Sequence, residues 1–137
     1  MMTANHDLAS NEPSLRRWWS GITIVLALAV FTEAVFAGAM LSGVDWARAA
    51  HSVTAVVLIA STLTAGLVSI VVLRRVPHGP KLGLTLLSLA AAIFLQIAAG
   101  KLSAEGANLL WVHVPLGVAL AGFAAYAVAG ARRLGAG

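Results

Sequence analysis

The chain has no cysteine and few charged residues, and both shortages exclude classes of function. Without cysteine it can form no disulfide, thiolate metal site, iron–sulfur cluster or thiol nucleophile. Only 10% of its 137 residues are charged and 60% are hydrophobic, whereas about a quarter of the residues in an ordinary soluble domain are charged. A surface so poor in charge would precipitate in water, so the composition indicates one domain that has the lipid bilayer as its solvent.

Four apolar segments predict the fold. Each is close to the roughly 20 residues that a membrane-spanning helix needs, and backbone groups in lipid must hydrogen-bond within their own segment. The expected helices cover residues 18–41, 49–73, 82–102 and 109–130. The breaks between them are short, so consecutive helices should be antiparallel neighbours. We therefore expect an all-α integral membrane protein, a four-helix antiparallel bundle over residues 15–133, preceded by a disordered cytoplasmic tail over residues 1–14.

The basic residues predict the orientation of this bundle. Seven of them flank the helices on the side that holds both termini, namely Arg16, Arg17, Arg74, Arg75, Lys81, Arg132 and Arg133. Only Arg48 and Lys101 lie on the other side. The positive-inside rule then predicts a multi-pass protein of the cell membrane with both termini in the cytoplasm. No basic patch exists outside these flanks, so nothing supports nucleic-acid binding, and the short loops favour partners within the membrane, such as a redox protein or a quinone.

An internal repeat relates the first two segments to the last two. An ungapped shift of 62 residues superimposes identical residues, among them Gly21 on Gly83, Gly38 on Gly100 and His51 on His113. This indicates two tandem helical hairpins, related by a pseudo-twofold axis along the membrane normal. In a square bundle the second and fourth helices are then diagonal. The two histidines should face each other at one depth, near the extracytoplasmic end.

A diagonal pair of inward-facing histidines suits a haem. Small residues follow each histidine along its helix, which favours a helix–helix interface over lipid. A haem is a flat disc with two axial positions, and imidazoles from diagonal helices can fill both. Gly38 and Gly100 on the flanking helices would let the porphyrin lie close to the backbone, and Arg48 and Lys101 would pair with its propionates. The sequence thus predicts a b-type haem with the two histidines as iron ligands.

Two polar residues within the expected helices, Glu33 and Gln96, leave alternatives open. An acid at the bilayer centre costs roughly 2.5–3.5 kcal/mol on insertion scales, so Glu33 should be protonated, paired or in a polar cavity. Its functional interpretations are a proton relay, a quinone contact or a partner for a histidine ring N–H. The structural interpretation is a protonated acid bonded to a neighbouring backbone or to Gln96. Zinc fits less well than haem, because the nearest ligands beyond the two histidines would be Glu33 and Asp45.

One family has a matching arrangement. A four-helix unit with a histidine near the outer start of its second and fourth helices resembles one half of haem A synthase, especially over residues 110–117 (LWVHVPLG). The resemblance covers residues 18–130 and implies a bundle that offers a histidine pair to a haem. The family carries an acidic residue shortly before the second-helix histidine, where this chain has Ala47, Arg48, Ala49 and Ala50. A complete synthase also has a second bundle, which this chain would gain only as a homodimer.

Three function classes follow from these features. The first is a bis-histidine b-type haem protein for electron transfer or haem handling. The second is a cofactor-free membrane assembly or packing subunit, and the third is a haem-modifying enzyme related to haem A synthase. The chain also resembles small uncharacterised bacterial four-helix membrane proteins with the same two histidines, and that resemblance implies no reaction.

Overall fold

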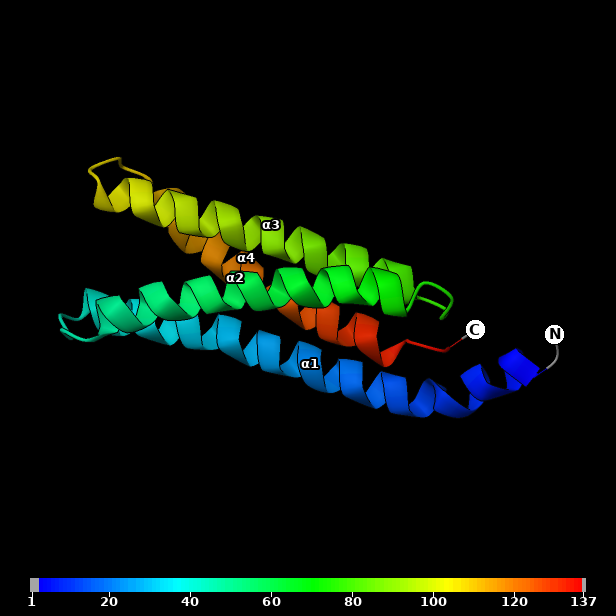
Figure 1. The fold of residues 1–137 in the computed structure, drawn as a ribbon. Helices are drawn as coiled ribbons and strands as arrows, with labels where there is room; N and C mark the ends of the chain where they lie inside the picture. The colour runs from blue at the N-terminus through cyan, green and yellow to red at the C-terminus, as the bar shows by residue number, and fades with distance from the viewer. Residues whose placement is uncertain (1–2, 137) are drawn as a thin grey trace.

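The computed structural model describes the backbone of residues 3–136 and the side chains of residues 13–136, and it is all-helical (Figure 1). Its helices are α1 (Thr3–Leu41), α2 (Ala47–Val72), α3 (Gly79–Ala104) and α4 (Leu110–Arg132). Each contains a stretch long and apolar enough to cross a membrane. The expected all-α four-helix bundle is confirmed, and the ends of α2, α3 and α4 lie within three residues of the predicted ends.

Helix α1 begins well before the first apolar segment. It starts at Thr3 and includes Pro13, whereas the stretch suited to a membrane begins only at Pro13. The first turns of α1 therefore include most of the segment for which the sequence predicts a disordered tail, residues 1–14. Residues 1 and 2 and the side chains before Pro13 lie outside the described part of the chain, so the disorder of this tail stays a prediction.

The four helices form a square. Helix α1 packs against α2 and α4, and α3 packs against the same two helices. Within the described residues α1 does not contact α3, and α2 does not contact α4, so these pairs are the diagonals. The connections at residues 42–46 and 105–109 share one end of the bundle, here named the loop end. The connection at residues 73–78 lies at the other end with the start of α1 and the end of α4, here named the terminal end (Figure 1).

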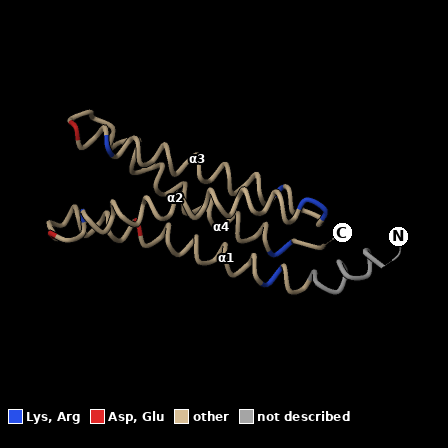
Figure 2. The backbone as a smooth tube through the Cα atoms, viewed as in Figure 1, with Lys and Arg blue, Asp and Glu red and all other residues tan. Residues whose placement is uncertain are grey.

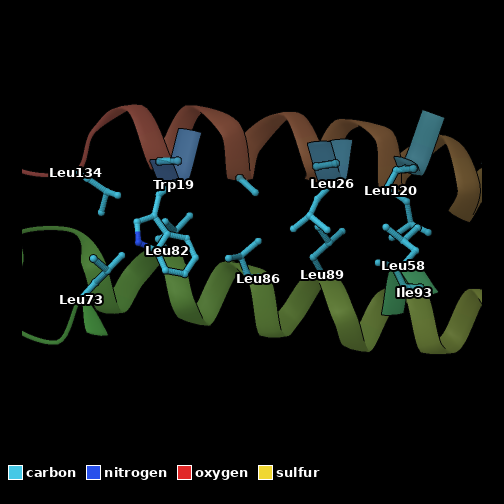
Figure 3. Packing of buried hydrophobic residues seen from close by; sticks show 14 of the residues in the cluster. Trp19, Leu26, Leu58, Leu73, Leu82, Leu86, Leu89, Ile93, Leu120 and Leu134 are labelled. Atoms are coloured by element: carbon cyan, nitrogen blue, oxygen red, sulfur yellow. The ribbon is translucent and has the colours of Figure 1, made fainter. Parts of the chain in front are cut away.

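The hydrophobic core fills the terminal half and the middle of the bundle (Figure 3). Leu73, Leu82 and Leu86 are completely or almost completely buried there. Helices α2 and α3 approach each other closely at Gly83, where a Cβ atom would lie 2.5 Å from Cγ1 and 3.0 Å from the backbone nitrogen of Ile70. A larger residue at position 83 would push the two backbones apart, so this glycine is required for the tight packing.

The core ends at a layer with one buried residue from each helix: Val30, Leu58, Ile93 and Leu120. Between this layer and the loop end, Ala47 is the only fully buried residue in the described part of the chain. The other interior side chains there are partly exposed. The packing therefore divides the bundle into a dense terminal half and a looser loop half.

Charged side chains lie almost entirely at the two ends of the bundle (Figure 2). The seven basic residues named above are at the terminal end, and Arg48 and Lys101 are at the loop end. Among the described residues, Glu33 is the only charged residue that lies between the two ends of the bundle (Figure 2). The outer surface between the ends is apolar, as shown by Val57 and Val118, which are 59% and 73% exposed. Such a surface is suited to lipid.

Candidate functional site

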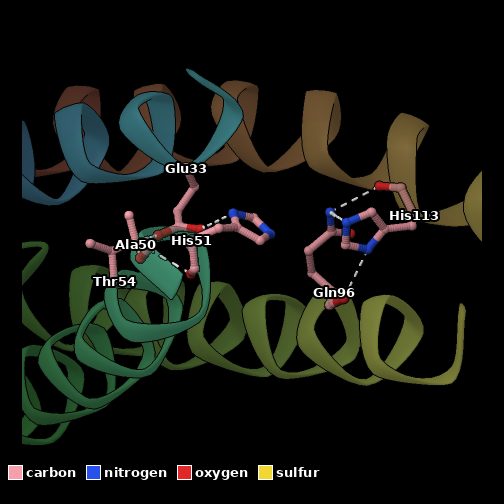
Figure 4. A network of polar contacts seen from close by, with 6 residues as sticks. All are labelled: Glu33, Ala50, His51, Thr54, Gln96 and His113. Carbon is pink, nitrogen blue, oxygen red and sulfur yellow. Dashed lines mark hydrogen bonds and ion pairs between the residues drawn. The ribbon is translucent and has the colours of Figure 1, made fainter. Parts of the chain in front are cut away.

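The ring of His51 is held by a carboxylate from the neighbouring helix. Near the start of α2, His51 Nδ1 lies 2.6 Å from Oε2 of Glu33 on α1, and the two side chains are only 24% and 13% exposed (Figure 4). The Thr54 hydroxyl, one turn further along α2, contacts the other carboxylate oxygen and lies 2.7 Å from the Ala50 carbonyl. Both oxygens of Glu33 therefore have partners. The structure places Glu33 against a histidine ring and not against Gln96.

The ring of His113 is held by the backbone of α3. Its Nδ1 lies 3.0 Å from the carbonyl oxygen of Gln96. A carbonyl only accepts hydrogen bonds, so Nδ1 carries the proton and Nε2 carries the lone pair. The Gln96 amide nitrogen donates to the His113 carbonyl at 2.9 Å and lies 3.4 Å from His113 Nε2. The amide oxygen of Gln96 is buried and has no hydrogen-bond partner in the described part.

Gly100 makes this position of His113 possible. A Cβ atom on Gly100 would lie 2.9 Å from Cε1 and 3.3 Å from Nδ1 of the imidazole. Gly38, its match in the sequence repeat, is different, because a Cβ atom there would meet nothing within 4 Å. The two glycines that the sequence assigns to one role thus have different surroundings. Only Gly100 is in contact with a histidine.

Sequence reasoning missed Thr54 at this site, and it identified Gly117 only as one of the small residues that follow His113 along its helix. Thr54 lies one turn after His51, so the helical period places it on the same face of α2. Gly117 is four residues after His113, and a Cβ atom there would lie 3.1 Å from the Gln96 amide nitrogen. In both cases the spacing of three or four residues from a histidine indicates the same helix face. The residues that they contact on the neighbouring helix could not be identified from this spacing.

Arg48 and Lys101 are exposed at the loop end (Figure 2). Neither has a carboxylate within 4 Å in the part of the chain that the structure describes. Trp46, also at this end, packs edge-to-face on Phe36 with ring centroids 5.9 Å apart. The structure therefore leaves both basic side chains available to an anionic group, and it brings neither into contact with the histidines.

The two imidazoles come from diagonal helices, and in Figure 4 the ring of His51 points across the interior toward Gln96 and His113. Each Nδ1 atom is tied to the preceding helix of the chain. A histidine fixed in this way presents Nε2 for coordination, as most metal-binding histidines do when Nδ1 bonds to a carboxylate or carbonyl. No group of three or more histidine, aspartate or glutamate residues suited to a metal ion is found among the described residues. Glu33 and Asp45 therefore do not complete a zinc site with the histidines.

Comparison with known proteins gives no further information about this site. The chain matches no protein-family model, no curated protein and no solved structure. Functional interpretation therefore depends on the two histidines, their partners and the packing around them.

Proposed function

We propose that the protein is a multi-pass protein of the cell membrane that binds one b-type haem through His51 and His113 and acts in electron transfer or haem handling. The four long apolar helices and their exposed hydrophobic surface support insertion in a membrane. The excess of basic residues at the terminal end supports cytoplasmic termini. In this orientation both histidines lie toward the extracytoplasmic side.

The single observation that carries the haem proposal is the way the two imidazoles are held. His113 donates Nδ1–H to the Gln96 carbonyl at 3.0 Å, and His51 Nδ1 lies 2.6 Å from Glu33 Oε2, within ion-pair distance, so a group on an adjacent helix orients each ring with Nε2 as the coordinating atom. The rings come from diagonal helices, so they can approach a flat group from opposite faces. A single metal ion is a poorer fit, since two histidines provide fewer than the three protein ligands of a typical zinc site.

The surroundings of the histidines fit a haem in two respects. The loop half lacks a packed core, and Gly100 lets the His113 imidazole, one of the two proposed ligands, lie directly on α3. The Gln96 amide must turn aside for His113 Nε2 to coordinate, because its nitrogen lies 3.4 Å from that atom. Two hydrogen bonds to His113 hold the amide nitrogen, one to the carbonyl at 2.9 Å and one to Nε2 at 3.4 Å, and coordination requires the second to break. The amide oxygen has no hydrogen-bond partner to lose among the described residues.

The residues of the chain have separate roles in this proposal. A bis-histidine haem supplies one-electron transfer, since both axial positions of the iron are filled. Glu33 increases the basicity of His51 through Nδ1. Arg48 and Lys101 are available at the loop end for the propionates, and the core layer keeps water out of the terminal half. The redox partner is then a membrane protein or a quinone that reaches the loop end.

An absorption spectrum of the purified protein tests the proposal. Wild type, His51→Ala and His113→Ala are expressed with haem supplied, and His78→Ala, a change in the turn at the terminal end, is the matched control. We expect a b-type spectrum with a redox-sensitive Soret band in wild type and in His78→Ala. Both site variants should lose haem or shift to a spectrum with one open axial position. A colourless wild type, or unchanged spectra in both site variants, would exclude haem ligation.

One observation favours a second candidate, a cofactor-free packing or assembly subunit. His51 lies 2.6 Å from the Glu33 carboxylate and His113 is hydrogen-bonded to Gln96, so polar contacts already join neighbouring helices, as in membrane helix bundles without cofactors. This candidate predicts that the protein stays colourless after reconstitution with haem and that both alanine variants are destabilised. The third class, a haem-modifying enzyme, predicts a haem that leaves as an altered product. It also predicts a homodimer, which supplies a second bundle.

A further inference from the structure

A polar pocket lies at the terminal end, at the opposite end of the bundle from the two histidines. It lies between α3 and α4, and its volume is about 50 Å³. The side chains that matter for its chemistry are His78, Lys81, Thr85, Tyr126, Ala129 and Arg133. The pocket contributes nothing to the proposed haem site and needs its own explanation.

The polar groups of this pocket are mainly hydrogen-bond donors. Lys81 and Arg133 are exposed and have no carboxylate within 4 Å in the described part of the chain. The Tyr126 hydroxyl and the ring of His78 can each add a donor. The Thr85 hydroxyl is already committed to the Lys81 carbonyl at 2.8 Å. Two cations with further donors and no acid favour an anion with several acceptor oxygens, such as a phosphate group.

The pocket is held together by the backbone. The connection between α2 and α3 turns at His78, which has a left-handed φ of 64°. The amide of Gly79 then donates to the Val76 carbonyl at 2.9 Å, which closes the turn. The amide of Gly135 donates to the Pro77 carbonyl at 3.3 Å and so ties the segment after α4 to this turn. These bonds fix His78 relative to Arg133 before any ligand arrives.

Size and position select the kind of ligand. Small-molecule pockets usually measure about 300–1,000 Å³, so a volume of about 50 Å³ admits only a small group. The rest of the ligand must lie outside, against the apolar surface of the helices, where Leu84 is 61% exposed. Tyrosine is typical of the membrane–water interface, and basic pockets between helices on the cytoplasmic side bind anionic lipid head groups.

We infer that this pocket binds the head-group phosphate of one anionic phospholipid from the inner leaflet, with Lys81 and Arg133 as the charge partners. Tyr126 and His78 donate hydrogen bonds to the phosphate oxygens, and the acyl chains lie along the lipid-facing surface of α3 and α4. The inference is independent of haem binding, because the two sites share no residue.

Native mass spectrometry of the full chain, released from detergent, tests the lipid site. The probes are phosphatidylglycerol and phosphatidylcholine with identical acyl chains. Each basic residue near an anionic lipid contributes about a fivefold preference, so with two such residues wild type should retain phosphatidylglycerol roughly 25-fold better than phosphatidylcholine. In the double variant Lys81→Gln/Arg133→Gln this preference should fall to near unity.

Two further variants separate the pocket from the general charge of this end. The matched control Arg74→Gln/Arg132→Gln removes the same charge from residues that do not line the pocket, and it should keep most of the preference. Ala129→Leu fills the pocket from an exposed position without a change in charge, and it should lose the preference. Circular dichroism checks the helix content of each variant. If the pocket double variant does not fold, Ala129→Leu alone decides the outcome.

Three results would overturn the inference. Wild type could show no preference for phosphatidylglycerol, or the two double variants could lose it equally, which would indicate diffuse surface charge. Inorganic phosphate at millimolar concentration could displace the lipid completely, which would indicate a site for a free anion. We expect phosphate to displace little lipid, because it lacks the acyl chains that lie on the helix surface.

Discussion

His51 and His113 occupy matching positions on diagonal helices, yet different groups hold their rings. His51 bonds to a carboxylate that also contacts Thr54. His113 bonds to a main-chain carbonyl and lies directly on Gly100. In the proposed haem site, the carboxylate beside Nδ1 would make His51 a stronger electron donor to the iron than His113, whose Nδ1 bonds to a main-chain carbonyl. The two histidines thus occupy equivalent positions in the sequence repeat and have different partners.

The largest expected effect comes from the glycine beside His113. Gly100→Ala places a Cβ atom 2.9 Å from the imidazole, so the ring or α3 must move. Such overpacking typically costs about 1–3 kcal/mol, and haem occupancy should fall with it. Gly38→Ala is the matched control, because its Cβ meets nothing within 4 Å. Denaturant unfolding and haem absorbance measure both variants, and equal losses would mean that the two glycines have one role.

The carboxylate beside His51 should come next. Glu33→Ala removes the carboxylate 2.6 Å from the partly buried His51 Nδ1, and the loss of this polar partner should cost about 1–3 kcal/mol in unfolding free energy. Glu33→Gln retains an acceptor oxygen and should recover most of that loss. It also removes the negative charge that stabilises the oxidised iron, so the midpoint potential of the proposed haem should rise. An unchanged potential in Glu33→Gln would show that the difference between the histidines has no electronic consequence.

A smaller effect is expected at Thr54, which supports Glu33 from α2. Thr54→Val keeps the shape of the side chain and removes the hydroxyl, at a cost of about 0.5–1.5 kcal/mol. Thr32→Val is the control, since the Thr32 hydroxyl is exposed and bonds only to the Leu28 carbonyl of its own helix. Thermal unfolding in detergent compares the two variants. The role of Thr54 is refuted if Thr32→Val is equally destabilising.

The smallest effect is expected at Gly117. Gly117→Ala brings a Cβ atom to 3.1 Å from the Gln96 amide nitrogen, which is the end of a flexible side chain and can move aside. We expect a change in unfolding free energy below about 0.5 kcal/mol. Because the amide moves away from His113 Nε2, haem affinity should be equal or higher in a titration. A marked loss of affinity would show that Gln96 assists ligation.

The sequence was sufficient to predict the helices and their number. Backbone groups in lipid must bond within their own segment, so apolar length alone defines each span, and short connections force antiparallel neighbours. The early start of α1 was not predictable in this way, because residues before Pro13 are polar and lack the apolar pattern that marks a span. The position of the core, concentrated in one half of the bundle, was also not apparent, since small apolar residues occur along all four helices.

The candidate site was predictable in its positions and not in its contacts. The repeat identified the two histidines and the two glycines, because identical residues in one register are visible in sequence. It did not show that Gly38 is open while Gly100 supports a ring, since that depends on the rotamer of a residue on another helix. The pairing of Glu33 with His51 was one of several alternatives for the same reason. The helical period predicts which face of a helix carries a given residue. The residue that it contacts on another helix depends on how the helices pack.

The packed layer at Val30, Leu58, Ile93 and Leu120 separates the histidines from the terminal end of the bundle. Between it and the terminal end, buried apolar side chains from all four helices fill the interior of the bundle. In the proposed orientation, anything that exchanges with the histidines must come from the outer face of the membrane or sideways from its outer leaflet. An electron delivered there would stay on that side unless a neighbouring protein carried it across.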